Sequence, residues 1–85
     1  MTITYSRNFI KQAEKLPINI KVKLYERIRT FRDNPLHPTL RNHSLRGKYK
    51  DYRSIDVTGN VRALYLQEND AAIFDAVGTH SQLYG

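Results

Sequence analysis

The chain has 85 residues, of which 40% are hydrophobic and 26% are charged, a composition typical of one globular domain spanning residues 1–85. It contains no cysteine, which excludes disulfides and thiolate metal sites and is typical of a reducing cytoplasm. Fourteen Lys and Arg against eight Asp and Glu give a net charge of +6, which favours polyanionic partners, above all nucleic acid.

The N-terminal half predicts one strand followed by two helices. Residues 2–5 alternate polar and apolar side chains, as a half-buried strand does, and Ser6 can cap the helix that follows. Apolar residues then recur at helical spacing, and Pro17 separates a first helix from a second one that ends at Asn34. The side chains expected in the core are Phe9, Ala13 and Leu16 of the first helix and Ile20, Leu24, Ile28 and Phe31 of the second.

The C-terminal half predicts a loop and three strands. Residues 35–47 contain two prolines and are typical of a connecting loop, which at this length is often functional in a small domain. Strands are expected at 49–57, 61–67 and 71–77, joined by tight turns, and Gly78 should begin a short tail. The predicted fold is α+β in the order β-α-α-β-β-β, with a helical hairpin packed on a mainly antiparallel sheet.

Positive charge is concentrated in one stretch, residues 41–53, called the basic segment below. No Lys or Arg follows Arg62. A one-sided distribution of this kind is what binding to an RNA backbone requires. The basic residues of the segment are Arg41, Arg46, Lys48, Lys50 and Arg53.

Several common chemistries lack their motifs. There is no HExxH pair, GxSxG elbow, Walker loop or GxGxxG, so no metal site and no cofactor is predicted. His, Arg, Lys and Tyr remain, and these can cleave RNA without a metal. One group takes the proton of the ribose 2′-OH, a cation stabilises the phosphate, and an acid protonates the leaving oxygen. Most small basic proteins contain such residues, so this set alone leaves the function open.

The aromatic and histidine candidates also have structural interpretations. His43 can satisfy loop carbonyls, His80 can cap the last turn, and Tyr84 can pack a terminal helix turn onto the sheet. Tyr52 and Phe74 are expected in the core rather than as a platform on which bases stack.

The charged candidates have structural interpretations as well. Arg53 and Arg62 can pair with Asp56 or Asp75 at the surface, where such a pair is worth less than about 1 kcal/mol. The lysines of the basic segment can form an ordinary solvated face. His37, between two prolines, is interpreted as structural.

Three stretches carry recognisable motifs. Residues 42–53 (NHSLRGKYKDYR) fit the pattern H-x-L-x-G-x-(W/Y)-x-x-Y-R, residues 62–65 (RALY) fit R-x-x-Y, and residues 78–85 (GTHSQLYG) fit G-T-H-x-x-L-(F/Y)-G. Together with the helical half, these stretches resemble the YafQ-like toxins of the RelE/ParE superfamily over essentially the whole chain.

The resemblance implies the toxin of a type II toxin–antitoxin system. Such a toxin is a metal-independent endoribonuclease that enters the ribosomal A site, cuts mRNA and inhibits translation, and a cognate antitoxin holds it inactive. ParE-like relatives share the architecture but poison DNA gyrase by binding, without nuclease activity. A third alternative is an inactive toxin that only binds an antitoxin.

The resemblance also assigns roles by position. His80 and His43 match family histidines implicated in catalysis, with His80 the first choice. Tyr84 matches the terminal aromatic that contacts substrate, and Arg62 matches the strand arginine that contacts phosphate. The residues expected to bind the RNA backbone are Arg46, Lys48, Lys50 and Arg53.

The chain departs from the family pattern at three positions. Asp56, Asn60 and Val61 stand where YafQ-like proteins place a histidine, an aspartate and a tryptophan. An aspartate ionises near pH 4 and is a poor acid at neutral pH, so Asp56 is expected to act as a base or to orient and activate His80.

Location and partner complete these expectations. The N-terminus lacks the apolar stretch of a signal peptide and no window reaches the length of a membrane span, so a cytoplasmic protein without membrane contact is expected. An antitoxin segment is expected to contact Lys48, Lys50 or Arg62.

Overall fold

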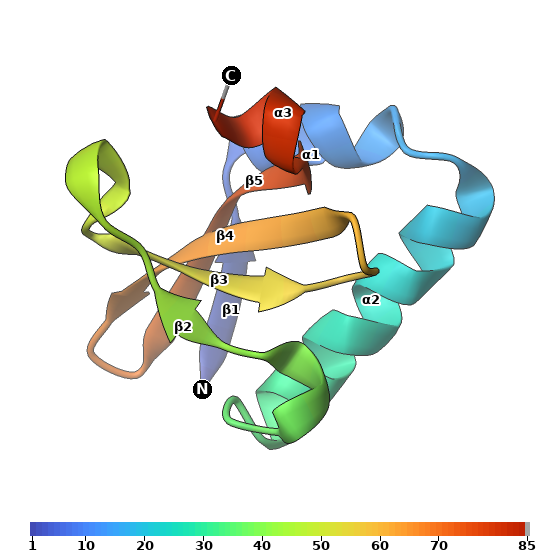
Figure 1. Ribbon diagram of the computed structural model, residues 1–85. Coiled ribbons are helices and arrows are strands. Elements are labelled where there is room, and N and C mark those ends of the chain that lie inside the picture. The colour runs from blue at the N-terminus through green and yellow to red at the C-terminus, as the bar shows by residue number, and fades with distance from the viewer. Residues whose placement is uncertain (85) are drawn as a thin grey trace.

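A computed structural model describes residues 1–84 (Figure 1). Its N-terminal half contains β1 (Thr2–Tyr5), α1 (Arg7–Glu14) and α2 (Ile18–Asp33). Ser6 caps α1, since its hydroxyl accepts a hydrogen bond from the backbone N–H of Phe9 at 3.0 Å. Pro17 precedes α2 and Asn34 follows it, so the strand and both helices predicted for this half are confirmed.

The C-terminal half differs from the prediction in its details. It contains the 3-10 turns η1 (Pro38–Leu40) and η2 (Gly47–Tyr49), the strands β2 (His43–Ser44), β3 (Tyr52–Asp56), β4 (Val61–Glu68) and β5 (Ala71–Thr79), and the helix α3 (His80–Tyr84). The expected loop at 35–47 therefore holds a helical turn and a short strand.

Two expected boundaries were wrong. The strand expected from Tyr49 begins only at Tyr52, because Gly47 adopts a φ of 65° and starts the turn η2. Gly78 lies inside β5 and does not begin a tail, and the chain after it folds as α3. Gly85, the last residue of the C-terminal motif, lies outside the described residues.

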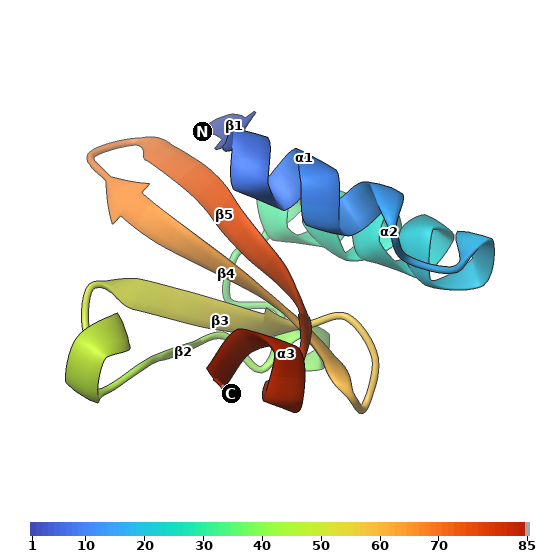
Figure 2. The ribbon, with the colours of Figure 1, turned by 90° about the horizontal axis from the view of Figure 1, so that it is seen from above.

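The five strands form one sheet in the order β1-β5-β4-β3-β2. β1 runs parallel to β5 and the other neighbours are antiparallel, so the expected mainly antiparallel sheet is confirmed. Figure 2 shows α1 and α2 on one side of the sheet and α3 on the other. Within residues 1–84, no helix is long and apolar enough to cross a membrane.

The hydrophobic core lies between the sheet and the two long helices. Phe31 of α2 packs edge-on against Phe74 of β5, with ring centroids 5.3 Å apart, and both rings are fully buried. Phe74 is thus in the core as expected. Tyr52 is not, because strand alternation directs its side chain to the face away from α1 and α2, where it is only half-buried.

Candidate functional site

The strand register collects candidate residues from distant parts of the chain. His43 on β2 pairs with Ser54 on β3, and Ser54 pairs with Leu64 on β4. Two residues further along β3, Asp56 pairs with Arg62. Because directly opposite residues of an antiparallel pair point to the same side, these side chains share the face of the sheet that α1 and α2 leave uncovered.

The helix α3 stands over this face and is held there by a reciprocal cap. Gln82 donates its backbone N–H to Thr79 Oγ1 at 3.2 Å, and Thr79 donates its own N–H to Gln82 Oε1 at 2.8 Å. Leu83 is buried and anchors the helix from below. His80 and Tyr84, one turn apart, therefore lie side by side with ring centroids 4.8 Å apart.

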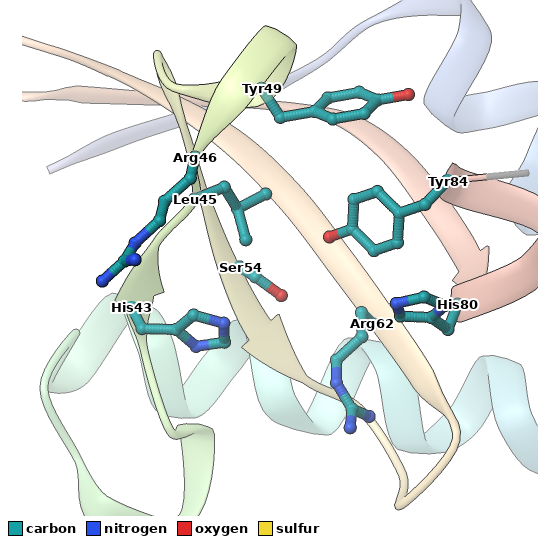
Figure 3. A pocket seen from close by; sticks show the side chains of 8 residues that line it. All are labelled: His43, Leu45, Arg46, Tyr49, Ser54, Arg62, His80 and Tyr84. Atoms are coloured by element: carbon teal, nitrogen blue, oxygen red, sulfur yellow. The ribbon is translucent and has the colours of Figure 1, made fainter.

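A pocket of about 290 Å³ lies between α3, the sheet and the segment that leads from β2 to η2 (Figure 3). It brings together five of the residues predicted from the sequence, which enter it from β2, β4, α3 and the segment before η2. The residues that line it are His43, Leu45, Arg46, Tyr49, Ser54, Arg62, His80 and Tyr84.

The hydrogen bond of His43 fixes its tautomer. Its Nδ1 lies 2.7 Å from the backbone carbonyl oxygen of Arg41, which adopts a left-handed conformation with a φ of 47°. A carbonyl oxygen only accepts, so Nδ1 must carry the proton, and Nε2 of the neutral ring keeps a lone pair. His43 thus satisfies a loop carbonyl, as its structural interpretation predicts, and also presents a basic nitrogen at the pocket.

Arg62 is held in place by its neighbours. Its Nε lies 3.0 Å from Asp56 Oδ1, and its Nη1 donates to the backbone carbonyl of Thr58 at 2.9 Å. The expected pairing of Arg62 with Asp56 is confirmed. The other oxygen of Asp56 lies 3.6 Å from Arg41 Nε, so the described partners of this carboxylate are two arginines. Asp56 contacts Arg62 but does not line the pocket.

Tyr49 supports Tyr84 and was not among the residues singled out from the sequence. Its hydroxyl donates to the backbone carbonyl of Leu83 at 2.9 Å, and its ring meets that of Tyr84 edge-on at 5.2 Å. The pKa of Tyr84 is raised above 10.0, mainly by burial and to a smaller extent by the nearby Tyr49 hydroxyl, whereas Arg62 lowers it. Tyr84 is therefore a neutral O–H donor near pH 7. Tyr49 occupies the (W/Y) position of the first motif, and this motif position is the sequence signal by which Tyr49 could have been predicted as a site residue.

The basic segment is divided between two faces of the sheet. Arg46 lines the pocket, whereas Lys48 and Lys50 are exposed around η2, with Lys48 Nζ 5.3 Å from the centroid of the Tyr49 ring. Arg53 points to the opposite face, and its Nε donates to Asn42 Oδ1 at 2.9 Å. Its expected pairing with Asp56 or Asp75 was wrong, because strand alternation separates it from both carboxylates.

Within residues 1–84, no three His, Cys, Asp or Glu side chains lie close enough together to hold a metal ion. The pocket instead presents a histidine nitrogen with a free lone pair, a second histidine, an oriented guanidinium and a neutral phenol. This set can accept a proton, donate a proton and stabilise an anion in a small volume.

Comparisons with known proteins identify a family that matches the whole chain. The family model described as "Bacterial toxin of type II toxin-antitoxin system, YafQ" matches residues 1–85. The fold is similar to the crystal structure of YafQ from Escherichia coli strain BL21(DE3), with 26% identity over 98% of this chain and 97% of that chain and a TM-score of 0.84.

Two further structures are similar over the same length. A copper-bound mutant toxin from Helicobacter pylori is 32% identical, with 99% of both chains covered and a TM-score of 0.82. The toxin of the E. coli DinJ–YafQ complex is 25% identical, covers 98% of this chain and 97% of that chain, and has a TM-score of 0.73. No curated protein sequence matches the chain. The match of the family model over all 85 residues shows that this chain belongs to the YafQ family of toxins of bacterial type II toxin–antitoxin systems.

Proposed function

We propose that this toxin is a metal-independent endoribonuclease that cuts mRNA in the ribosomal A site and so inhibits translation. The observation that carries the proposal is the pocket itself, where His43, His80, Arg62 and Tyr84 converge from two strands and a helix far apart in sequence. RNA cleavage by its own 2′-OH needs a base, an acid and a stabiliser of phosphate charge, and this pocket offers each of them.

The two histidines divide the proton transfers in this proposal. His43 Nε2 removes the proton of the ribose 2′-OH, and the 2′-oxygen then forms a bond to the adjacent phosphorus. The bond from phosphorus to the 5′-oxygen breaks, and protonated His80 gives its proton to that oxygen. The products are a 2′,3′-cyclic phosphate and a 5′-hydroxyl end, and each positioned group contributes roughly 10²–10⁴-fold in rate.

Arg62 and Tyr84 act on the phosphate between the histidines. The guanidinium stabilises the charge that builds on the phosphate oxygens as the 2′-oxygen attacks, and Tyr84 donates its hydroxyl to the substrate. Asp56 positions Arg62, since it holds Nε at 3.0 Å while Nη1 is held by a backbone carbonyl.

The exposed cations around the pocket guide the RNA. Arg46, Lys48 and Lys50 attract the backbone to the open face, where the phosphate contacts are sequence-independent and weaken with salt. Arg53 lies on the other face and positions the chain before His43 through Asn42.

The partner proposed for this chain is a cognate antitoxin. The related E. coli YafQ is found in a complex with DinJ, and a RelE toxin from Methanococcus jannaschii is found in a complex with RelB. Acidic residues of the antitoxin would cover Lys48, Lys50 and Arg62 and so close the pocket to RNA.

Primer extension on a reporter mRNA in a reconstituted translation system tests the proposal. Discrete cuts within translated codons, absent when ribosomes are omitted, are the expected result. Intact mRNA in the presence of ribosomes would overturn it, and inhibition of DNA gyrase supercoiling in a parallel assay would then place the toxin with the ParE-like proteins.

A further inference from the structure

One buried hydroxyl in the pocket has no hydrogen-bond partner among the described residues. Within residues 1–84, Ser54 Oγ is the buried side-chain polar atom that makes no hydrogen bond, and the residue is 1% exposed. Figure 3 shows this hydroxyl at the floor of the pocket, directed into the space between His43, Arg62 and Tyr84. Buried hydroxyls are almost always satisfied, so an exception at this place calls for a functional explanation.

The fold gives no structural reason for a hydroxyl here. Ser54 pairs with His43 on one side and Leu64 on the other, and its backbone groups belong to the sheet. If the position required only a small side chain beneath the pocket, alanine would fill it without a buried polar group to satisfy. The nearby histidine does not supply the missing bond, because His43 Nδ1 is engaged by the Arg41 carbonyl and Ser54 Oγ makes no hydrogen bond to the other ring nitrogen.

The surroundings of the hydroxyl identify the chemistry that would satisfy it. A phosphate oxygen is a strong acceptor, and an anion at this point would be faced by the guanidinium of Arg62, by the hydroxyl of Tyr84 and by the imidazole of His80. A hydroxyl that donates from the floor would then complete a ring of donors around the anion.

We propose that Ser54 Oγ donates a hydrogen bond to a non-bridging oxygen of the scissile phosphate and thereby forms the floor of a phosphate-binding subsite. This inference rests on the proposed ribonuclease function and deepens it. It adds a residue that contacts the substrate and that no motif of the sequence marks.

Binding to the free toxin tests the subsite without the ribosome. The probes are adenosine 3′-monophosphate, which carries a phosphate on the 3′-oxygen as the scissile phosphate does, and adenosine, which lacks it. Affinities are measured by NMR titration for the wild type, Ser54→Ala and Ser54→Thr. Ser44→Ala is the matched control, because Ser44 pairs with Arg53 and its side chain lies on the opposite face of the sheet. Urea unfolding of each variant is measured in parallel.

The expected result separates binding from stability. Ser54→Ala should weaken the binding of adenosine 3′-monophosphate about 10- to 100-fold, as for the loss of a hydrogen bond to a charged group. Binding of adenosine should be unchanged, Ser54→Thr should restore much of the phosphate affinity, and Ser44→Ala should behave as the wild type. The unfolding midpoint of Ser54→Ala should equal or exceed that of the wild type, because the variant no longer buries an unsatisfied hydroxyl.

The outcomes keep the two proposals distinct. Equal affinity of the wild type and Ser54→Ala for adenosine 3′-monophosphate would overturn the role of Ser54. A destabilised Ser54→Ala protein, in which the affinity for adenosine 3′-monophosphate relative to that for adenosine is unchanged, would overturn it as well. Neither result would bear on the ribonuclease activity. Phosphate binding that depends on Ser54, in a toxin that cuts no mRNA on ribosomes, would support the subsite and overturn the proposed function.

Discussion

Gly78 of β5 faces Gln82 of α3 so closely that a Cβ atom at Gly78 would stand 2.8 Å from Gln82 Oε1 and 3.2 Å from Gln82 Cβ. The same Oε1 accepts the backbone N–H of Thr79 and closes the cap of α3. The glycine of the G-T-H motif is therefore required for the close approach of a helix that carries His80 and Tyr84 into the pocket.

Substitution of this glycine should displace α3. Gly78→Ala is expected to cost about 1–3 kcal/mol of stability, because the added methyl cannot be accommodated beside Gln82. It should also lower mRNA cleavage, since both rings of α3 move with the helix. Gly59→Ala is the matched control, because a Cβ at Gly59 meets no atom within 4 Å. Urea unfolding and cleavage assays check both effects, and a Gly78→Ala protein with wild-type cleavage would argue against α3 as part of the site.

The ion pair between Asp56 and Arg62 should contribute both to stability and to the rate of cleavage. Asp56→Asn removes the charge that holds Arg62 Nε and should cost about 1–3 kcal/mol, as for other hydrogen bonds to charged groups in largely buried positions. Cleavage should fall about 10- to 100-fold through kcat, because a misaligned Arg62 stabilises the phosphate charge less well. Single-turnover kinetics on ribosomes measure this change. Arg41→Ala, which removes only an exposed cation 3.6 Å from Asp56, should cost less than about 1 kcal/mol. A selective rise in KM would contradict the positioning role of Asp56.

The helical half of the fold could be predicted from the sequence because its signals are local. The spacing of Phe9 and Ala13, the Ser6 cap and the break at Pro17 each act within a few residues. The C-terminal half depends on longer-range geometry, and there the strand limits were wrong. The left-handed turn at Gly47 delays β3. The helix α3 also has a local signal, the T-x-x-Q capping box at Thr79, which marks the start of a helix where a tail was expected.

The residue types of the site could also be predicted, but their mutual contacts could not. His43, His80, Arg62 and Tyr84 are marked by motifs, whereas their convergence depends on the pairing of β2 with β3 and on the packing of α3. The ion pair of Arg62 with Asp56 was one of several pairings open to the sequence. The buried hydroxyl of Ser54 has no sequence signal, since an unsatisfied polar atom is defined only by its surroundings.

Alkaline pH should weaken a hydrogen bond beside the pocket. Tyr52 donates to Asp75 Oδ2 at 2.7 Å, and this hydrogen bond, followed by burial, raises the pKa of Tyr52 above 10.0. The folded state thus holds this proton more tightly than the unfolded state. The resulting stability is fully present below pH 10 and is lost as the pH rises through the folded pKa.

The Tyr52→Phe variant isolates this contribution. At pH 7 it should be less stable than the wild type by about 0.5–1.5 kcal/mol, the usual net value of one hydrogen bond. The difference should shrink above pH 10 as the wild type loses the proton. Urea unfolding at pH 7 and above pH 10 measures the difference in stability between the two proteins. A difference that stays constant with pH would contradict the hydrogen bond from Tyr52 to Asp75 as its source.

Charge reversal around η2 should weaken the antitoxin complex. The double variant Lys48→Glu/Lys50→Glu is expected to bind the cognate antitoxin more weakly and with less dependence on salt, because exposed cations that meet an acidic partner are screened by ions. The double variant Lys11→Glu/Lys15→Glu is the control, because it changes the net charge of the protein by the same amount. Its substitutions lie on α1 and directly after it, away from the pocket, so it should bind as the wild type does. Calorimetry at low and high salt compares the variants. A complex indifferent both to salt and to the charge at Lys48 and Lys50 would rule out this surface.

The most direct test of the account is the rate of mRNA cleavage by His80→Ala in the reconstituted translation system. His80 is exposed and makes no hydrogen bond within the described residues that its loss would break, so the variant should fold as the wild type does. Its single-turnover rate is expected to fall by roughly 10²–10⁴-fold, the contribution of a positioned acid or base. His37→Ala, which removes a histidine outside the pocket, should cut mRNA at the wild-type rate. Wild-type cleavage by His80→Ala would contradict the assignment of the pocket beneath α3 as the catalytic site.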